Sequence, residues 1–197
     1  MALSECECMI RRRSIRRMEE SGLKPVLDNY RFDNYETTSE WQRQAKDLAF
    51  EFLEHGGGWF FIAGSPGTGK THLCTAICGK LLEHRKSVRY MVWRKDAPRL
   101  KASVNERDVY DKIMDDFERC DVLYIDDFFK GTITEADINL AFELLNSRYN
   151  DRSKITILSS EKDINQILDI DEAVGSRIYE RCKHYYIETP DENYRLR

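Results

Sequence analysis

The residues best suited to chemistry form one glycine-rich octet followed by a histidine. The octet matches G-x-x-x-x-G-K-[ST], a pattern that predicts a loop for nucleotide phosphates. Glycines let backbone N–H groups turn toward phosphate oxygens, and a helix that follows adds the positive end of its dipole. We expect Lys70 to reach the β- and γ-phosphates and the Thr71 hydroxyl to bind magnesium. The predicted nucleotide-binding residues are Gly64, Ser65, Pro66, Gly67, Thr68, Gly69, Lys70, Thr71 and His72.

Two consecutive aspartates follow the short apolar run 122–125. The run predicts a buried strand, and ligands of α/β sheets collect where such strands end. We expect Asp126 to be the magnesium carboxylate beside Thr71. Asp127 is then placed to orient or deprotonate the attacking water in phosphoryl transfer. The alternative is a pair of aspartates that caps a helix.

Alternating strand-like and helix-like patterns must position these groups. The apolar run Trp59–Ala63 precedes the octet, and Leu73, Ile77 and Leu81 recur every four residues after it, which predicts strand, loop and helix. Further strands are predicted at 88–92, 122–125, 155–158 and 185–187, and helices at 109–117 and 172–182. Apolar strands alternating with helices predict an α/β fold, a three-layer P-loop NTPase sandwich with a mainly parallel five-stranded sheet.

Two further helices carry capping signals at their N-termini. Ser39 with Gln42 predicts one helix, which Gly56 and its two following glycines end. Thr134 with Asp137 predicts another. Helical spacing indicates that this second helix buries one face made of Ile138, Phe142, Leu145 and Tyr149.

Length and composition limit the class of protein. The 197 residues suffice for one sizeable core, and 41% hydrophobic with 34% charged residues is ordinary globular composition. No apolar run approaches the ~20 residues that cross a membrane, and no secretory signal follows the N-terminal basic residues. Six cysteines in such a chain suggest reduced thiols, so we expect a cytoplasmic protein without a membrane partner.

The order of these segments resembles AAA+ ATPases, and more narrowly the DnaC/DnaI-like helicase loaders of bacteria and phages. Residues 175–181 (GSRIYER) and 193–197 (NYRLR) narrow the resemblance, which extends over nearly the whole chain. Such loaders, as the resemblance implies, bind ATP with magnesium, contact single-stranded DNA and place a ring-shaped replicative helicase on it. Only residues 162–197 follow the fourth strand, so we expect no full helical lid domain.

The resemblance implies that the ATP site is completed by a second subunit. By position, Arg181 matches the family's arginine finger, which reaches into the ATP of a neighbour, with Arg177 one helical turn earlier as support or rival. A guanidinium there would stabilise the γ-phosphoryl transition state. The alternative is that both arginines project from an exposed helix face.

One strand end departs from the family pattern. Many relatives end this strand in Thr-Ser-Asn, whereas this chain has Ser159, Ser160 and Glu161. Glu161 cannot donate to a γ-phosphate as asparagine can, so Ser160 is the candidate substitute. Asp127 also stands where many AAA+ ATPases have glutamate. We therefore expect slow ATP hydrolysis until assembly or a partner completes the site.

Positive charge is local in this acidic chain, whose net charge is −4. One basic cluster follows the second strand, where loaders and initiators carry DNA-binding elements. An aromatic ring beside cations suits base stacking with neutralisation of the DNA backbone. Trp93 is equally compatible with a place in the core. The predicted DNA-binding residues are Trp93, Arg94, Lys95, Arg99 and Lys101.

The first thirty residues form a second basic region. We interpret residues 1–30 as a segment outside the ATPase core at 31–197, and as the remnant of a zinc-binding or partner-binding domain. Cys6 and Cys8 resemble the last cysteines of a zinc segment found before this core in some loaders. No second cysteine pair precedes them, and structural zinc usually needs four ligands, so we expect no zinc.

Three functions are compatible with these patterns. The first is a DNA-replication ATPase that assembles on single-stranded DNA through its ATP sites and loads a replicative helicase. The second is a transposase-helper ATPase of the IstB kind, which differs in its partner. The third is a small-molecule kinase, for which we find no convincing arginine-rich lid or nucleoside pocket.

Overall fold

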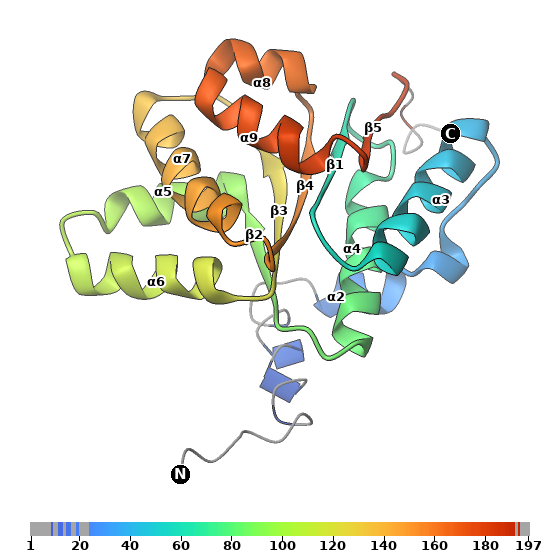
Figure 1. Ribbon diagram of the computed structural model, residues 1–197, viewed down its shortest axis with the longest axis horizontal. Helices are drawn as coiled ribbons and strands as arrows, with labels where there is room; N and C mark the ends of the chain where they lie inside the picture. Colours follow the sequence, from blue (N-terminus) through green and yellow to red (C-terminus); the bar gives the residue numbers. More distant parts are fainter. Residues whose placement is uncertain are drawn as a thin grey trace.

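The computed structural model has a parallel five-stranded sheet at its centre, with strands in the order β2-β3-β4-β1-β5 (Figure 1). It describes residues 24–191, Asn193 and six earlier positions: Met9, Arg12, Arg13, Ile15, Arg16 and Glu19. The strands are β1 Trp59–Ala63, β2 Val88–Val92, β3 Val122–Phe128, β4 Ile155–Ser160 and β5 Tyr186–Glu188. The predicted fold class and sheet are confirmed.

Helices cover both faces of the sheet (Figure 1). The apolar side chains of β1 alternate between two cores: Phe60 and Ile62 join the core under α3 and α4, whereas Trp59 and Phe61 join the core under α5 to α9. The helices are α2 Lys24–Asn29, η1 Phe32–Asn34, α3 Glu40–His55, α4 Lys70–Glu83, α5 Trp93–Ala102, α6 Arg107–Arg119, α7 Glu135–Asn150, α8 Ile164–Ile170 and α9 Glu172–Cys182.

The predicted helix starts are confirmed, and the predicted buried face of α7 is confirmed in part. Ser39 and Thr134 are N-caps with capping boxes, and α3 ends at the left-handed Gly56. Of the predicted face Leu145 is fully buried and Phe142 and Tyr149 are half-buried against the core, but Leu140, Leu144 and Arg148 are buried as well. Because α7 packs against α5, α6 and α9, apolar residues surround most of the helix and obscure its periodicity. Helices α5 and α8 were not predicted.

The edge of the sheet where β3 ends is irregular. The pairing of β3 with β4 shifts between Ile125 and Phe128, which is a β-bulge. Asp127 and Phe129 both have a φ of 56°, in the left-handed region that non-glycine residues rarely adopt. Such bulges re-aim side chains beside functional sites. The irregularity therefore coincides with the predicted aspartate pair.

The packed core begins before residue 31. Leu27 of α2 is half-buried against the core under α3 and α4, and the Tyr30 ring stacks on His72 at 4.7 Å. The predictions for Cys6, Cys8 and residues 194–197 lie outside the described part of the chain. The residues after β4 that the structure describes form α8, α9 and β5, and none of them makes a separate helical lid. No described helix has the length and apolarity to cross a membrane.

Candidate nucleotide-binding site

The glycine-rich octet forms a loop between β1 and α4, as predicted. Gly64 and Gly67 have φ angles of 132° and 82°, which favour glycine. A Cβ atom on Gly64 would lie 2.1 Å from the Thr189 hydroxyl oxygen, and one on Gly67 would lie 2.1 Å from the Asn193 side-chain oxygen. The backbone conformation and these close approaches together require glycine at both positions. The loop leads into the 14-residue helix α4, whose N-terminus faces the same space.

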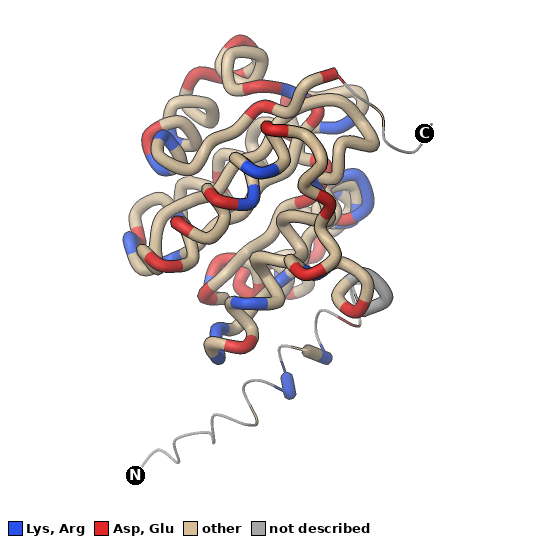
Figure 2. The backbone as a smooth tube through the Cα atoms, turned by 90° about the vertical axis from the view of Figure 1, so that its right-hand side faces the viewer, with Lys and Arg blue, Asp and Glu red and all other residues tan. Residues whose placement is uncertain are grey.

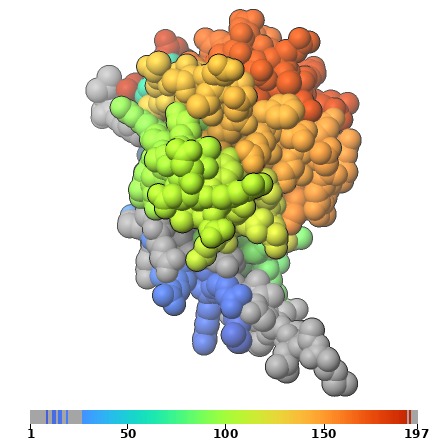
Figure 3. All heavy atoms as spheres, turned by 90° about the vertical axis from the view of Figure 1, so that its left-hand side faces the viewer, coloured from blue at the N-terminus to red at the C-terminus, as the bar shows by residue number. Residues whose placement is uncertain are grey.

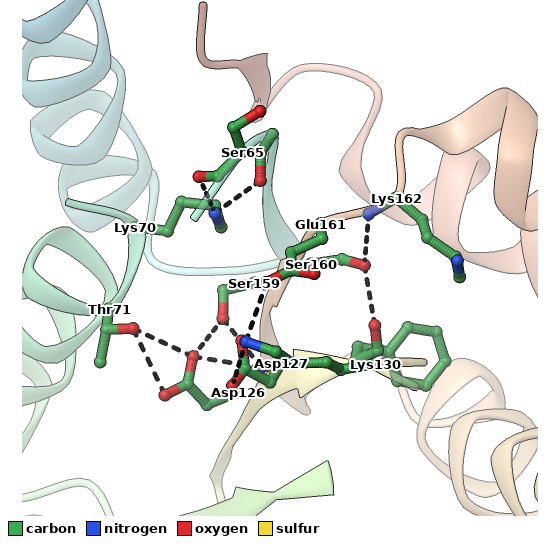
Figure 4. A network of polar contacts seen from close by, with 12 residues as sticks. Ser65, Lys70, Thr71, Asp126, Asp127, Lys130, Ser159, Ser160, Glu161 and Lys162 are labelled. Atoms are coloured by element: carbon green, nitrogen blue, oxygen red, sulfur yellow. Dashed lines mark hydrogen bonds and ion pairs between the residues drawn. The ribbon is translucent and has the colours of Figure 1, made fainter. Parts of the chain in front are cut away.

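Lys70 is folded back onto the loop (Figure 4). Its ammonium group donates to the carbonyl oxygens of Gly64 and Ser65 at 2.6 and 2.7 Å, and the residue is only 7% exposed. Burial lowers the pKa of Lys70, and the carboxylates of Glu161 and Asp127 oppose that effect. An incoming phosphate can replace these neutral carbonyl acceptors with a charged one.

Asp126 accepts hydrogen bonds from several elements. The Thr71 hydroxyl lies 3.3 and 3.4 Å from its two oxygens, and the Tyr90 hydroxyl donates to it at 2.8 Å. Ser159 also donates to Asp126. Burial and the nearby Asp126 charge raise the pKa of Tyr90, which therefore remains a donor. Tyr90 and Ser159 were not predicted, because only the parallel pairing of β2, β3 and β4 brings them to Asp126.

The Thr71 hydroxyl and the Asp126 carboxylate fit magnesium. Both supply hard oxygen ligands, and magnesium is usually held by one or two such groups together with substrate phosphates. Within the described residues there is no cluster of three or more His, Cys, Asp or Glu side chains that could hold a metal by itself. This arrangement suits a cation that arrives with a nucleotide.

Asp127 lies beside Asp126 but takes different partners. Lys130 contacts both Asp127 carboxylate oxygens, at 3.3 and 3.2 Å, and forms a 2.8 Å ion pair with Glu161 (Figure 4). The pKa of Lys130 is raised: burial acts to lower it, but the two carboxylates outweigh burial. Lys130 was not predicted from the sequence, because its ion-pair partner Glu161 lies thirty-one residues later in the chain.

Ser160 does not face the phosphate loop. It is fully buried, and its hydroxyl donates to the Phe128 carbonyl oxygen at 2.8 Å while accepting from the backbone N–H of Lys162 at 3.0 Å. The hydroxyl proton is thus used in the hydrogen bond to Phe128 and cannot also be donated to a phosphate. Ser160 as the substitute donor to a γ-phosphate does not hold in this structure. The neighbouring Ser159 orients Asp126 instead.

One pocket of about 380 Å³ joins these groups. The loop and the start of α4 line one side with Lys70 and Thr71, and Asp127, Lys130 and Glu161 line the other. The predicted ligands Lys70 and Thr71 thus share one cavity with a second set of charges.

His72 lines the pocket but is held by the segment before α3. Its Nε2 lies 3.0 Å from the Arg31 carbonyl oxygen and 3.2 Å from the Asn34 side-chain oxygen, two acceptors that indicate a proton on Nε2. Burial lowers the pKa of His72, which favours the neutral ring. His72 therefore ties residues 30–35 to the start of α4.

The chain after β5 crosses the glycine-rich loop. The Thr189 N–H donates to the Ala63 carbonyl oxygen at 2.8 Å, and the Thr189 hydroxyl donates to Thr68 at 3.1 Å. Ser65 donates to Asp191 at 2.5 Å. These contacts link positions more than 120 residues apart and brace the loop.

The two arginines of α9 differ in accessibility. Arg181 is 7% exposed, lies over the Trp59 ring at 5.7 Å and donates to the Lys154 carbonyl oxygen at 3.4 Å. Trp59 begins β1, at the end of the strand away from the phosphate loop. Arg181 is the less accessible of the two, and its assignment as the arginine finger stays a prediction. Arg177 is half-buried, with its guanidinium over the Phe142 ring at 4.7 Å, and it is the more accessible candidate.

The predicted DNA-binding residues also differ in accessibility. Trp93 is 3% exposed and packs edge-on against Phe128 and Phe129, so it is not available for base stacking. Lys101 is engaged by Asp137 at 2.6 Å. Arg94, Lys95 and Arg99 are exposed on α5, which shares one side of the molecule with α6 (Figure 3). Elsewhere acidic and basic residues are mixed along the chain (Figure 2).

Fold and site together define a class. A parallel sheet in this strand order, with a phosphate loop after β1 and an aspartate pair at the end of β3, is that of an AAA+ type P-loop ATPase. The chain belongs to the family of IstB-like ATP binding proteins, whose model matches residues 3–197.

Individual proteins agree with this membership. The chain is 32% identical to the uncharacterized protein YqaM of Bacillus subtilis, over 93% of this chain and 62% of YqaM. It is 26% identical to the replicative helicase loader DnaC of Escherichia coli, over 85% of this chain and 69% of DnaC. The fold matches a solved structure of the replication initiator DnaA bound to AMPPCP and single-stranded DNA, with TM-score 0.70, 24% identity and coverage of 83% of this chain and 50% of that one. The predicted resemblance to helicase loaders is confirmed.

Proposed function

We propose that this protein is a DNA-replication ATPase that binds ATP with magnesium, assembles on single-stranded DNA and helps to load a replicative helicase. The observation that carries the proposal is one pocket lined by the phosphate loop, Thr71 and Asp127, with the Asp126 carboxylate 3.3 Å from the Thr71 hydroxyl. Similarity to a helicase loader over most of the chain supports the replication role. The protein would act in the cytoplasm.

In this proposal each pocket residue has one task. Backbone N–H groups of the loop and Lys70 hold the phosphates, and Thr71 with Asp126 holds magnesium. Magnesium, when bound, neutralises charge on the phosphates. Asp127 orients the attacking water or accepts its proton. Hydrolysis is slow in a single subunit, because the arginine that stabilises the transition state comes from a neighbouring subunit.

Assembly would complete the site. Arg177 is the proposed residue that reaches a neighbouring subunit's nucleotide, since it is the more accessible arginine of α9. Exposed Arg94, Lys95 and Arg99 on α5 are proposed to contact the DNA backbone. We assign residues 1–30 to partner binding, as the five arginines within 11–17 suggest.

Size-exclusion chromatography with light scattering tests the proposal. We expect a larger assembly only when ATP, magnesium and single-stranded DNA are all present. Lys70→Ala should weaken ATP binding ~100-fold and abolish assembly, because it removes charged hydrogen bonds to the phosphates. Lys80→Ala, on the exposed side of α4, is the matched control. A monomer under every condition would overturn the assembly mechanism, and unchanged ATP binding by Lys70→Ala would overturn the site.

The DNA surface has its own test. Replacing Arg94, Lys95 and Arg99 together by alanine should reduce the slope of log affinity against log salt by ~2, as expected for three lost contacts to a single strand. Replacing Arg107, Lys112 and Arg119 of the acidic helix α6 controls for net charge. Equal losses in both variants would argue against a DNA site on α5.

A second candidate is a transposase-helper ATPase, favoured by the family model itself. The two functions share the nucleotide chemistry and differ in the partner. Affinity capture with purified replicative helicase and with purified transposase distinguishes them. Binding of transposase alone would replace the first candidate by the second.

A further inference from the structure

Lys130 and Glu161 have no task in the proposed reaction, although both line its pocket. Their ion pair stands opposite Lys70, at the ends of β3 and β4 (Figure 4). Lys130 also contacts Asp127, the proposed residue for the attacking water, at 3.2 Å. The pocket thus contains a cation shared between two carboxylates.

The backbone holds Lys130 in this place. Its N–H donates to the Asp127 carbonyl oxygen at 3.0 Å, which closes a tight turn with left-handed residues at Asp127 and Phe129. Phe128 and Phe129 are fully buried and stack on each other at 4.1 Å. Because both preceding rings are anchored in the core, the backbone that leads to Lys130 is held in place. It remains over the pocket with 28% of its side chain exposed.

Lys130 offsets the negative charge on its side of the pocket. Asp127 and Glu161 place two negative charges on the side where the end of a nucleotide's phosphate chain would lie, opposite Lys70. Two carboxylates beside a terminal phosphate would repel it unless a cation lay between them. No donor is available from Ser160, whose hydroxyl is bonded to Phe128. Of the groups on that side of the pocket, Lys130 alone can donate to a phosphate there.

We propose that Lys130 senses the terminal phosphate and makes the site distinguish ATP from ADP, an inference that rests on the proposed ATP site. An ammonium group has three donors, so Lys130 can keep Glu161 and exchange Asp127 for a γ-phosphate oxygen. Glu161 acts as a positioning residue that aims the ammonium group. The exchange frees Asp127, so binding of ATP and readiness for hydrolysis become coupled. Lys130 and Glu161 together replace the single asparagine found at this strand end in many relatives.

The competing explanation is a structural ion pair that braces the strand ends. Such a pair would affect both nucleotides equally, because it would not touch the γ-phosphate. The ratio of the affinities for a triphosphate and a diphosphate therefore separates the two explanations, and overall binding strength does not.

Titration calorimetry with AMPPCP and with ADP, both with magnesium, measures this ratio without hydrolysis. For Lys130→Gln we expect affinity for AMPPCP to fall ~10-fold, the usual value of one charge-assisted hydrogen bond, with ADP affinity within ~2-fold of wild type. Lys130→Arg keeps the positive charge and should retain most of the ratio. Lys162→Ala, the neighbouring lysine whose side chain points away from the network, is the control (Figure 4).

Each result decides the proposal. Selective loss of AMPPCP affinity in Lys130→Gln, with recovery in Lys130→Arg, supports it. Equal losses for both nucleotides in Lys130→Gln, or an unchanged ratio in that variant, overturn it in favour of the structural ion pair. If the wild-type protein binds neither nucleotide, the ATP site itself fails, which is a different outcome. Thermal unfolding of each variant shows whether a lost ratio reflects a lost fold.

Discussion

Buried cations occur at both ends of the sheet, and they are used in opposite ways. At the end where the strands begin, Arg148 is fully buried and donates to the carbonyl oxygens of Phe117 and Ile155 at 2.8 and 2.6 Å and to the Thr156 hydroxyl at 3.0 Å. At the end where the strands finish, Lys70 donates to two loop carbonyls. Burial lowers the pKa of each.

The difference lies in whether the acceptors can be exchanged. The acceptors of Arg148 belong to chain segments that enter β3 and β4, and no solvent or ligand can take their place. The acceptors of Lys70 line a pocket, so a phosphate can replace them. Buried charge with fixed partners stabilises the fold, and buried charge with exchangeable partners prepares a site.

The largest effect should come from the fixed end. Arg148→Met removes the guanidinium and leaves several buried carbonyl groups without donors, so we expect a loss of ~3–5 kcal/mol in the free energy of unfolding. Urea denaturation followed by circular dichroism measures it. Arg152→Met is the control, because Arg152 is 71% exposed and pairs only with Glu180 among the ion pairs of the described residues. A loss below ~1 kcal/mol for Arg148→Met would remove the distinction between the two ends.

The sequence predicted correctly those features that depend on residues close together in the chain. The octet, Asp126 and the caps at Ser39 and Thr134 are local patterns, and the structure has each in the expected element. The ion pair of Lys130 with Glu161 instead depends on strand pairing and on the bulge after Ile125. No spacing rule predicts such a contact.

The arginines illustrate the same limit. Arg177, Arg181 and Arg148 all lie on helices with mixed surfaces; the first two were interpreted as a finger or as an exposed face, and Arg148 carried no prediction. The tertiary structure shows that Arg148 on α7 and Arg181 at the end of α9 are buried. The sequence of each helix does not reveal this. Trp93 is similar, since an aromatic residue at a strand end suits a core and a binding surface equally well.

The exchangeable end gives the next largest effect. Tyr90→Phe removes the 2.8 Å hydrogen bond to Asp126, so the magnesium carboxylate loses one of the groups that orient it. Loss of such an outer partner typically weakens metal affinity ~10-fold or more. We expect nucleotide binding to require ~10-fold more magnesium, with nearly unchanged stability.

Magnesium titrations at fixed nucleotide concentration measure this change. Tyr110→Phe is a matched control, because its hydroxyl also donates to a carboxylate, Glu143, away from the pocket. A Tyr90→Phe protein with normal magnesium dependence but lower stability would place Tyr90 with the fixed partners, as at the other end of the sheet.

The smallest effect concerns Asp137, a charged group with fixed partners. Lys101 donates to it at 2.6 Å, and the Thr134 N–H donates to it at 3.0 Å at the start of α7. Burial acts to raise the pKa of Asp137, but these hydrogen bonds outweigh burial and lower it below the usual value of 3.8. Asp137→Asn should therefore cost ~1 kcal/mol near neutral pH.

The pH dependence identifies the charge as the cause. A carboxylate whose pKa is lower in the folded protein stabilises the fold fully above its unfolded pKa of about 3.9, and this contribution disappears as the pH falls through the folded value. The stability gap between wild type and Asp137→Asn should stay constant from about pH 5 to 8 and narrow below about pH 4. Asp111→Asn, in an exposed pair with Arg107, should show almost no gap at any pH. A gap for Asp137 that persists unchanged in acid would mean that geometry of the cap, and not its charge, stabilises α7.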